Sequence, residues 1–347
     1  MQLSDGDTGV DPGPYTRYSG GVIDADTPIS RFRPLPWLSN RHAQTIWASV
    51  CRRAPRVALT PERLELDDGD FLDIFWGPRQ DSGPVVQLLH GLGGCARSPY
   101  MLGLTEALTA RGCQCVILQY RGAGAPNRRQ RFYFAADTAD PARVASVAAE
   151  RLPDRPLYAV GVSLGASMLL NWLAQDGQDC PVQRAAAISP PFDLGACADA
   201  INQGFARIYQ RHLLTELKRM YASKFVHDEP PVPHATIQAL PSLRAFDDVI
   251  TAPFHGFRDA EDYYNRCSCG PRLSEIHQST LILHARDDPF IPARTIPARE
   301  AVSEPVTLST PEHGGHVGFI SRDRGVVMPY YWAEATAAAF LADKAKG

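Results

Sequence analysis

Short apolar runs recur along the chain, and several are followed by longer stretches in which apolar residues return every three or four positions. The runs predict buried strands at residues 85–89, 115–118, 157–160, 185–188 and 280–284, and the stretches predict helices at residues 100–111, 140–151, 163–175 and 330–344. Strands that are apolar along their whole length must be covered on both faces. The alternation therefore predicts an α/β fold with a mainly parallel sheet and helices on both faces.

Three further segments precede this alternating region. Residues 63–66 and 71–76 flank an acidic turn, which predicts an antiparallel hairpin. Residues 29–56 contain several prolines, and we expect them to form an N-terminal extension that wraps the core without joining the sheet. Residues 1–28 are rich in Asp, Gly and Pro, and they are expected to be a flexible N-terminus before a single domain at residues 29–347.

The connection that precedes the last predicted strand is far longer than an ordinary loop. It spans about ninety residues, which predicts a helical cap insertion at about residues 193–275. Residues 196–221 have helical spacing, and a cluster of prolines follows them. The apolar stripe on this predicted helix consists of Ile201, Phe205, Ile208, Tyr209 and Leu213. Two interpretations stand: the stripe packs on the core alone, or it also lines an acyl pocket.

The cap insertion also carries aromatic residues near a pair of carboxylates, Asp247 and Asp248. The aromatic residues are Phe246, Phe254, Phe257, Tyr263 and Tyr264. They make the insertion apolar enough to cover a lipid-like chain. For the two carboxylates, capping a helix and holding an arginine are favoured over general acid chemistry.

The most specific motif is Gly161-Val162-Ser163-Leu164-Gly165, which lies between a predicted strand and a predicted helix. This context is typical of the nucleophile elbow of α/β-hydrolases, in which a strained turn presents a serine hydroxyl above the sheet. The alternative is a structural serine in an ordinary turn. A serine hydroxyl is a weak nucleophile, so the catalytic interpretation also needs a base, an orienting acid and an oxyanion hole.

A base and an acid follow Ser163 in the order that this fold uses. His316 lies in a glycine-rich loop near the C-terminus, and Asp288 follows an apolar strand at a turn bounded by proline. Asp287 competes with Asp288, but side chains of adjacent extended residues point in opposite directions, and we favour Asp288. His313 competes with His316, and we favour His316. Metal binding by the two histidines needs a third ligand, and none is evident in the sequence.

The predicted oxyanion hole combines two backbone N–H groups, those of Leu164 and Leu92. Leu164 follows the nucleophile. Leu92 lies in His90-Gly91-Leu92-Gly93-Gly94, directly after a predicted strand, and its glycine neighbours let the backbone approach an acyl oxygen. We expect His90 to brace this loop through hydrogen bonds and not to act as a catalytic base.

Several separated motifs together resemble one known family. They are Phe32-Arg33-Pro34, Ser39-Asn40-Arg41-His42-Ala43-Gln44-Thr45, the His90 loop with Ser98-Pro99-Tyr100, residues 120–127, 204–211, 246–251 and 260–264, and the His316 loop. The chain resembles the YheT-type branch of the α/β-hydrolase family, which is similar to mammalian α/β-hydrolase-domain lipid hydrolases and to yeast medium-chain ethyl-ester synthases and esterases. The resemblance implies Ser163 as nucleophile, Asp288 as acid and His316 as base. It also implies carboxylic esters with short or medium acyl chains, or related lipids, as substrates.

The sequence departs from the family pattern at two places beside the elbow. Members often carry Tyr-His-Ser-Gly where this chain has Tyr133-Phe134-Ala135-Ala136, and a second glycine where it has Ala166. The three candidate catalytic residues are unaffected. Because these loops shape the acyl pocket, the departures bear on substrate preference.

Composition agrees with an enzyme that acts on a small molecule. The chain has 347 residues and a net charge of −3, so no general attraction to nucleic acid or to an anionic membrane is implied. Eight cysteines lack the C-x-x-C spacing of zinc or redox sites and are expected to be free thiols. Neither a signal peptide nor an apolar segment of spanning length is evident, so we expect a cytoplasmic protein.

These observations predict a serine hydrolase that cleaves carboxylic esters through an acyl-enzyme on Ser163, without a cofactor or a metal. Two alternatives use the same fold. An alcohol in place of water would make the protein an acyltransferase, and a silent triad would leave a binding scaffold.

Overall fold

The computed structural model describes residues 32–226, 228–323 and 326–343 and contains one large sheet with the strand order β1-β2-β4-β3-β5-β6-β7-β8. The strands are β1 (Thr60–Glu65), β2 (Phe71–Trp76), β3 (Val85–Leu89), β4 (Gln114–Gln119), β5 (Leu157–Val162), β6 (Val182–Ile188), β7 (Ser279–Leu283) and β8 (Val306–Ser309). Strands β3 to β8 are parallel, and β1 and β2 add an antiparallel hairpin at one edge. The predicted α/β class, parallel sheet and hairpin are confirmed.

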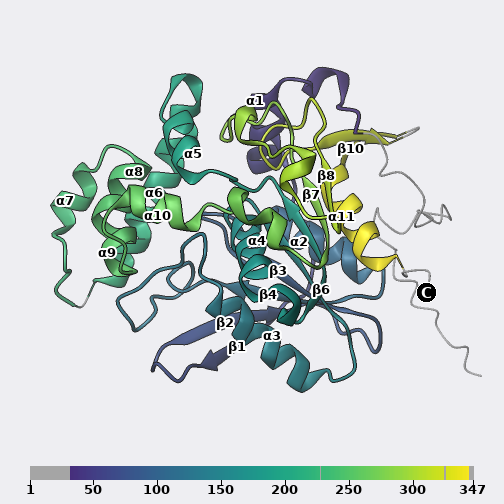
Figure 1. The fold of residues 1–347 in the computed structure, drawn as a ribbon, viewed down its shortest axis with the longest axis horizontal. Coiled ribbons are helices and arrows are strands. Elements are labelled where there is room, and N and C mark those ends of the chain that lie inside the picture. The colour runs from purple at the N-terminus through teal and green to yellow at the C-terminus, as the bar shows by residue number, and fades with distance from the viewer. Residues whose placement is uncertain (1–31, 227, 324–325, 344–347) are drawn as a thin grey trace, which may run out of the picture.

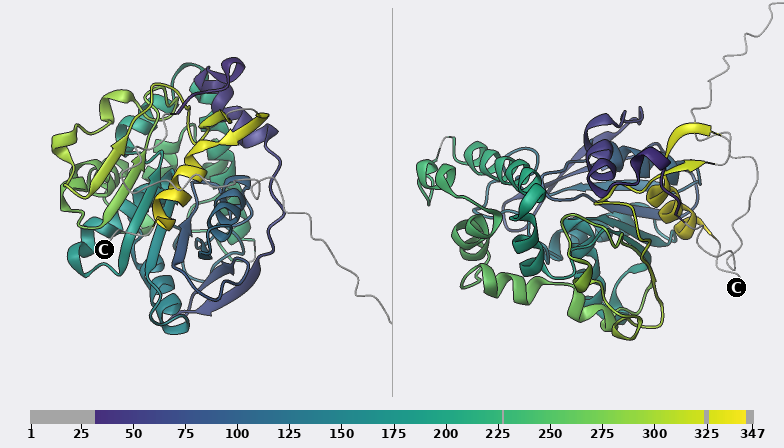
Figure 2. Two further views of the ribbon diagram at one scale, coloured as in Figure 1. Left: turned by 90° about the vertical axis from the view of Figure 1, so that its right-hand side faces the viewer. Right: turned by 90° about the horizontal axis from the view of Figure 1, so that it is seen from above.

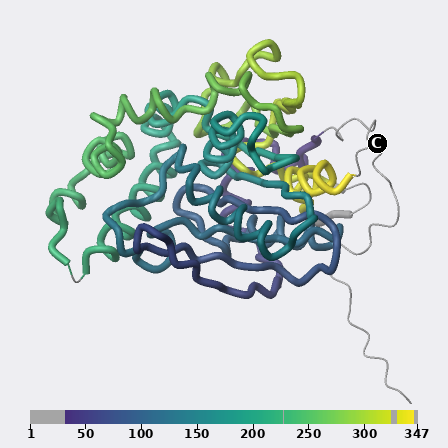
Figure 3. The backbone as a smooth tube through the Cα atoms, turned by 60° about the horizontal axis from the view of Figure 1, so that its bottom comes forward, coloured from purple at the N-terminus to yellow at the C-terminus, as the bar shows by residue number. Residues whose placement is uncertain are grey.

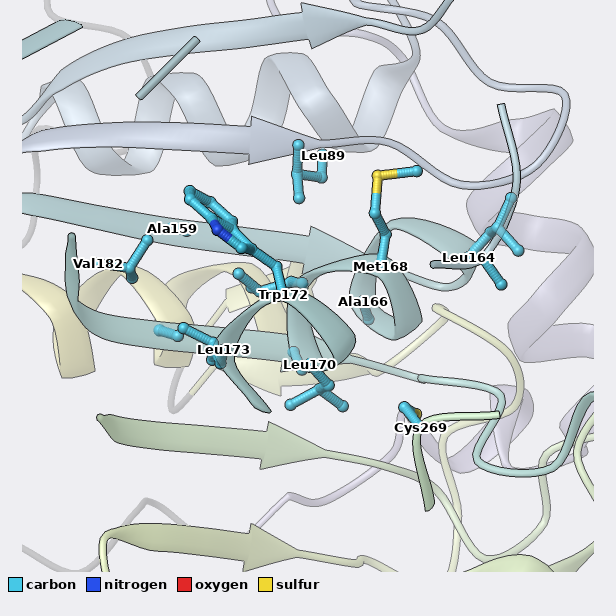
Figure 4. Packing of buried hydrophobic residues seen from close by; sticks show 14 of the residues in the cluster. Leu89, Ala159, Leu164, Ala166, Met168, Leu170, Trp172, Leu173, Val182 and Cys269 are labelled. Atoms are coloured by element: carbon cyan, nitrogen blue, oxygen red, sulfur yellow. The ribbon is translucent and has the colours of Figure 1, made fainter. Parts of the chain in front are cut away.

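Helices cover both faces of the sheet, as the apolar strands require (Figure 1). The helices outside the cap insertion are α1 (Arg41–Ile46), α2 (Pro99–Thr109), α3 (Ala139–Arg151), α4 (Leu164–Asp176) and α11 (Trp332–Ala342). Helices α3 and α4 share one buried apolar cluster with the sheet, and α2 and α11 share the other. Helix α4 is the most buried of them, and its Trp172 packs over the strands together with Leu173 and Leu170 (Figure 4).

The chain between β6 and β7 forms a separate lobe of helices beside the sheet (Figures 2 and 3). Its helices are α5 (Leu194–Ile201), α6 (Arg207–Lys224), α7 (His234–Ala239), α8 (Leu243–Phe246), α9 (Ala252–Phe254) and α10 (Ala260–Cys267). This lobe has an apolar cluster of its own, which includes Leu214, Tyr221, Phe246 and Ile250. The elements of the lobe fall within the predicted cap insertion, residues 193–275.

The single helix predicted at residues 196–221 is wrong, because the chain forms α5 and α6 with a break between them. Gly204 adopts a φ of 50°, a left-handed conformation that a continuing right-handed helix excludes and that glycine adopts without a Cβ penalty. The break turns α6 away from α5, so that residues on the predicted stripe belong to two different helices.

A second, small antiparallel sheet joins the N-terminal extension to the end of the chain. It consists of β9 (Ile320–Asp323) and β10 (Val326–Tyr331), and Pro34 forms an isolated bridge with Ser321. The helix predicted from residue 330 therefore begins later, at Trp332, because Tyr330 and Tyr331 pair with β9. The flexible N-terminus predicted at residues 1–28 lies outside the described residues.

Candidate active site

Ser163 occupies a strained turn between β5 and α4. Its φ is 54° and its ψ is −119°, a conformation that L-residues rarely adopt and that surrounding structure must impose. The Ser163 N–H donates to the Ile188 carbonyl at 2.8 Å, which ties the turn to the neighbouring strand β6. A Cβ on Gly165 would lie 2.5 Å from the His90 carbonyl oxygen, and one on Gly161 would overlap the Gly165 carbonyl. Positions 161 and 165, two residues before and after Ser163, must therefore be glycine.

Three polar side chains distant in sequence meet at this turn. The Ser163 hydroxyl lies 2.9 Å from His316 Nε2, and His316 Nδ1 lies 2.8 Å from an oxygen of Asp288. With the proton on Nδ1, His316 donates to the Asp288 carboxylate and accepts from the Ser163 hydroxyl. The other Asp288 oxygen accepts the N–H groups of Phe290 at 2.8 Å and Ile291 at 3.2 Å. The carboxylate is thus fixed on both oxygens.

The environment of Asp288 keeps its carboxyl group ionised. Burial alone would raise its pKa, but the His316 imidazole, the hydrogen bond to it and the Phe290 N–H together hold the pKa below its usual range. The adjacent Asp287 points elsewhere, where it accepts the Gly315 N–H at 2.9 Å and lies 3.4 Å from His313 Nδ1. The sequence left Asp287 or Asp288 as the acid and His313 or His316 as the base. In the structure, His316 contacts Ser163 and Asp288 contacts His316.

A column of aromatic rings links the His316 loop to the cap insertion and to α1. The Phe290 ring stacks on His316 at 4.1 Å, and Tyr209 of α6 lies 4.8 Å from Phe290. His42 of α1 completes the column through a 3.1 Å hydrogen bond between its Nδ1 and the Tyr209 hydroxyl. Close by, the His316 backbone N–H donates to the hydroxyl of Thr45 at 2.9 Å. The aromatic column therefore ties three separate segments to the imidazole.

In the loop after β3, tyrosine hydroxyls accept the N–H groups on either side of Leu92. The Gly91 N–H donates to the Tyr100 hydroxyl at 2.9 Å, and the Gly93 N–H donates to the Tyr133 hydroxyl at 3.0 Å. The Gly94 N–H donates to the Gly91 carbonyl at 3.0 Å. Among the described residues, no acceptor takes the N–H of Leu92 or that of Leu164. Both residues line the same cavity as Ser163.

His90 anchors this loop through its two ring nitrogens. It is fully buried, its Nδ1 donates to the Gly91 carbonyl at 2.8 Å, and its Nε2 lies 3.4 Å from the amide nitrogen of Gln119. Burial lowers the pKa of His90 to about 4, so the ring is neutral near pH 7. His90 thus occupies the bracing position expected from the sequence.

Ser163 opens into a cavity of about 720 Å³, a size typical of sites for small organic ligands. Its walls come from α1, the β3 loop, the elbow and the helices of the cap insertion. The stripe residues Ile201, Ile208, Tyr209 and Leu213 line it, whereas Phe205 does not. Of the two interpretations of the stripe, the structure therefore supports the one in which it faces a pocket.

Asp247 places a carboxyl group in this largely apolar wall. It accepts the hydroxyls of Thr251 at 2.6 Å and Tyr264 at 2.7 Å, and burial raises its pKa to about 6. Asp248 accepts the Ala260 N–H at the start of α10, as expected for a capping residue. The expectation that these carboxylates hold an arginine is wrong. Arg244, whose charge acts on Asp247, pairs with two other carboxylates, Asp199 and Glu261.

Four residues that shape the site were not singled out from the sequence. Thr45 and Phe290 hold the histidine loop, and the hydroxyls of Tyr100 and Tyr133 occupy N–H groups that flank Leu92. Tyr100 and Thr45 lie in motifs that carry the family resemblance, which was a usable signal. Tyr133 lies in the family segment beside the elbow, and Phe290 lies two residues after Asp288, but their contacts with Gly93 and His316 depend on the tertiary fold.

In the ranges 32–226, 228–323 and 326–343, no group of three or more His, Cys, Asp or Glu side chains is arranged to hold a metal ion. The same ranges contain no helix long and apolar enough to cross a membrane. All eight cysteines are free thiols.

Comparison with known proteins agrees with this architecture. Residues 84–323 match the alpha/beta hydrolase fold family, and the chain belongs to this family. Within it, the chain is 41% identical to the putative esterase YheT of Escherichia coli, over 88% of this chain and 91% of that protein. The resemblance to the YheT-type branch is therefore confirmed.

More distant relatives match over a similar length. The chain is 29% identical to phospholipase ABHD3 of Mus musculus, over 83% of this chain and 73% of that protein. It is also 29% identical to the medium-chain fatty acid ethyl ester synthase/esterase 2 of Saccharomyces cerevisiae, over 82% of this chain and 66% of that protein. Among solved structures, the alpha/beta hydrolase GrgF from Penicillium sp. sh18 matches with a TM-score of 0.52 and 17% identity, over 75% of this chain and 91% of that chain. This last match shows the fold.

Proposed function

We propose that the protein is a serine hydrolase that cleaves carboxylic esters of short or medium acyl chains, or lipid-like esters, through an acyl-enzyme on Ser163. The observation that carries the proposal is the hydrogen-bonded chain from Ser163 through His316 to Asp288 at the wall of a largely apolar cavity. The esterase, phospholipase and ethyl-ester synthase names of the relatives support an ester substrate.

In the proposed reaction, the Ser163 hydroxyl attacks the ester carbonyl carbon while His316 Nε2 takes its proton. Asp288 holds the Nδ1 proton in place and stabilises the imidazolium that forms. The backbone N–H groups of Leu92 and Leu164 bind the developing oxyanion, and such a donor is typically worth about 3 kcal/mol in the transition state. His316 then protonates the leaving alcohol. It next activates a water that releases the acid and frees Ser163.

The role of Leu92 and Leu164 in binding the oxyanion is supported by their backbone N–H groups, for which no acceptor is found among the described residues. The hydroxyls of Tyr100 and Tyr133 occupy the N–H groups on either side of Leu92 and leave its own N–H available. Donors held in this way need no reorganisation when charge develops on the substrate. The apolar walls and the aromatic side chains of the cap insertion fit the acyl chain.

The decisive test is covalent labelling of the full-length protein with a fluorophosphonate, followed by peptide mapping. We expect label on Ser163 and none in Ser163→Ala. A chain-length series of p-nitrophenyl esters then measures acyl preference, with Ser163→Ala expected to lower turnover by several orders of magnitude. Absence of label on a folded protein would favour the binding-scaffold alternative. Label on another residue would assign the chemistry elsewhere.

A second candidate function is acyl transfer to an alcohol, which the name of the yeast relative favours. The same acyl-enzyme would be intercepted by an alcohol instead of water. Product analysis with ethanol present separates the two reactions. Ester formation that exceeds hydrolysis at modest ethanol concentration would make the protein an acyltransferase.

We further propose a cytoplasmic location and a reaction that needs no cofactor. Eight free thiols, five of them buried, support a reducing compartment. The proposed chemistry uses only the side chains and N–H groups described above. Fractionation of cells that express the tagged full-length chain tests the location.

A further inference from the structure

Exposed apolar side chains gather in two segments of the structure. Among the described residues, the exposed large apolar side chains are Trp37, Ile46, Val50, Phe205, Ile208 and Val226. All but Val226 belong to residues 37–50 of the N-terminal extension or residues 205–208 of the cap insertion. Isolated exposed apolar residues are ordinary, but a group of them that shares one surface calls for an explanation.

The two segments are in direct contact with each other. The His42 ring lies 4.4 Å from the Phe205 ring, and His42 Nδ1 lies 3.1 Å from the Tyr209 hydroxyl. Trp37 continues the surface along the extension, because its ring packs at 5.1 Å against Trp47, the neighbour of Ile46. Helix α1 lies on the same side of the molecule as α5 (Figure 1).

Part of this apolar surface lies at the opening of the cavity. Ile46, Val50 and Ile208 are exposed to solvent and also line the cavity that contains Ser163, so they lie where the cavity meets the surface. We call the five residues Trp37, Ile46, Val50, Phe205 and Ile208 the mouth rim.

The exposed charged residues on the two segments of the mouth rim are arginines. Residues 32–61 and 200–215 contain no Asp or Glu, while Arg41, Arg207 and Arg211 are exposed on them. Arg41 is close enough to His42 and Tyr209 to influence the pKa of each. The acidic group that faces His42 is Asp287, which is partly buried and accepts the Gly315 N–H.

We propose that the mouth rim docks the protein onto an anionic lipid surface. Exposed aromatic and aliphatic side chains flanked by arginines, with no Asp or Glu on the same two segments, match an interfacial layer in which acyl chains lie beneath anionic headgroups. Docking in this orientation places the cavity opening against the lipid. If the proposed function holds, an ester then moves from the lipid layer to Ser163 without exposing its acyl chain to water.

Co-sedimentation with lipid vesicles tests the docking separately from catalysis. The full-length Ser163→Ala protein is mixed with vesicles of phosphatidylglycerol and phosphatidylethanolamine, or with vesicles of phosphatidylcholine alone. We expect binding to the first, weaker binding to the second, and weakening by salt. Trp37 provides a second readout: brominated lipid in the anionic vesicles should quench its emission, and the quenching should fall in Trp37→Phe.

Matched variants locate the surface. Val50 is 75% exposed and Val226 is 66% exposed, but only Val50 belongs to the mouth rim. We expect the double substitution Val50→Asp with Phe205→Asp to weaken vesicle binding by at least about tenfold, because it removes apolar contact and adds charges repelled by the headgroups. Val226→Asp, the control, should bind as the parent does. Arg207→Glu with Arg211→Glu should weaken binding to anionic vesicles more than to phosphatidylcholine.

Several results would overturn the proposal. The proposal fails if the parent does not bind anionic vesicles. It also fails if Val226→Asp and the double variant lose vesicle binding equally while thermal melting shows that both are folded. Equal binding to phosphatidylcholine would remove the role of charge. Sedimentation velocity that shows a dimer dispersed by Phe205→Asp, without vesicle binding, would assign the mouth rim to a second copy of the chain. Because vesicle binding is measured in Ser163→Ala, failure of the proposed esterase activity would leave these results unaffected.

Discussion

Replacing Asp288 by Asn tests the proposed acid while leaving its local structure in place. An Asn oxygen at this position can still accept the N–H groups of Phe290 and Ile291. What is lost is the negative charge that faces His316 Nδ1 at 2.8 Å. The substitution therefore removes an electrostatic interaction and changes little of the surrounding packing.

The size of the effect follows from the geometry. When His316 becomes positively charged, its charge centre lies about 4 Å from that of Asp288, and at an effective dielectric constant of about 20 the attraction is worth about 4 kcal/mol. That value corresponds to a rate reduction of about a thousandfold. The Asn amide can also donate to Nδ1 and so favour the wrong tautomer, and the same substitution in a well-studied serine protease triad costs about 10⁴. We therefore expect Asp288→Asn to lower kcat by a factor of about 10³ to 10⁴.

The assay is hydrolysis of p-nitrophenyl butyrate, with thermal melting to show that each variant is folded. Asp287→Asn is the matched control, because Asp287 is adjacent in sequence and binds Gly315 instead of His316. We expect Asp287→Asn to retain activity within about tenfold of the parent. The assignment of the acid would be refuted if folded Asp288→Asn kept activity within about tenfold, or if the two variants lost activity equally.

Three further substitutions test the strain, packing and protonation described above. Ser163→Gly should be about 1 kcal/mol more stable to urea than Ser163→Ala. Both variants lose the hydroxyl, but only glycine relieves the strain of the positive φ. Equal stability of the two variants would contradict strain at the elbow. Gly165→Ala should destabilise the protein by about 1–3 kcal/mol, since its Cβ would lie 2.5 Å from the His90 carbonyl oxygen, and an unchanged denaturation midpoint would contradict the close approach. Burial lowers the pKa of His284 to about 4, below its ordinary value of 6.5. As the pH falls, the unfolded chain therefore binds this proton before the folded chain does. The parent loses folding stability between about pH 6.5 and pH 4. Relative to the parent, His284→Leu should therefore gain up to about 3 kcal/mol in urea unfolding between pH 7 and pH 4, and a pH-independent difference would refute the buried neutral ring.

The sequence predicted the sheet well because its signal is local. Strands β3 and β4 are buried at every position, so their apolar runs stand out without knowledge of the fold. The elbow was equally visible, since steric crowding at Gly161 and Gly165 restricts both positions to one residue type. Ser163, Asp288 and His316, chosen from motifs, lie within hydrogen-bonding distance, and their catalytic roles stay predictions.

The elements that were missed depend on longer-range contacts or on one residue's conformation. The break between α5 and α6 rests on the positive φ of Gly204, which apolar periodicity does not record. Strand β10 forms because Tyr330 and Tyr331 find partners in β9, although the following residues favour a helix. The Tyr133 hydroxyl reaches Gly93 across 40 positions of sequence, and no local pattern marks that contact.

The aromatic column has a consequence for how this architecture can be altered. His42, Tyr209 and Phe290 come from three separate segments, and each contacts the next on the way to His316. A chimera that receives a foreign α6 would inherit a mismatched neighbour for Phe290 and would leave His42 without its phenolic partner. Exchange of specificity between relatives therefore requires that α1, α6 and the residue-290 turn be transplanted together, whereas α7 lies outside this coupled unit and can be varied on its own.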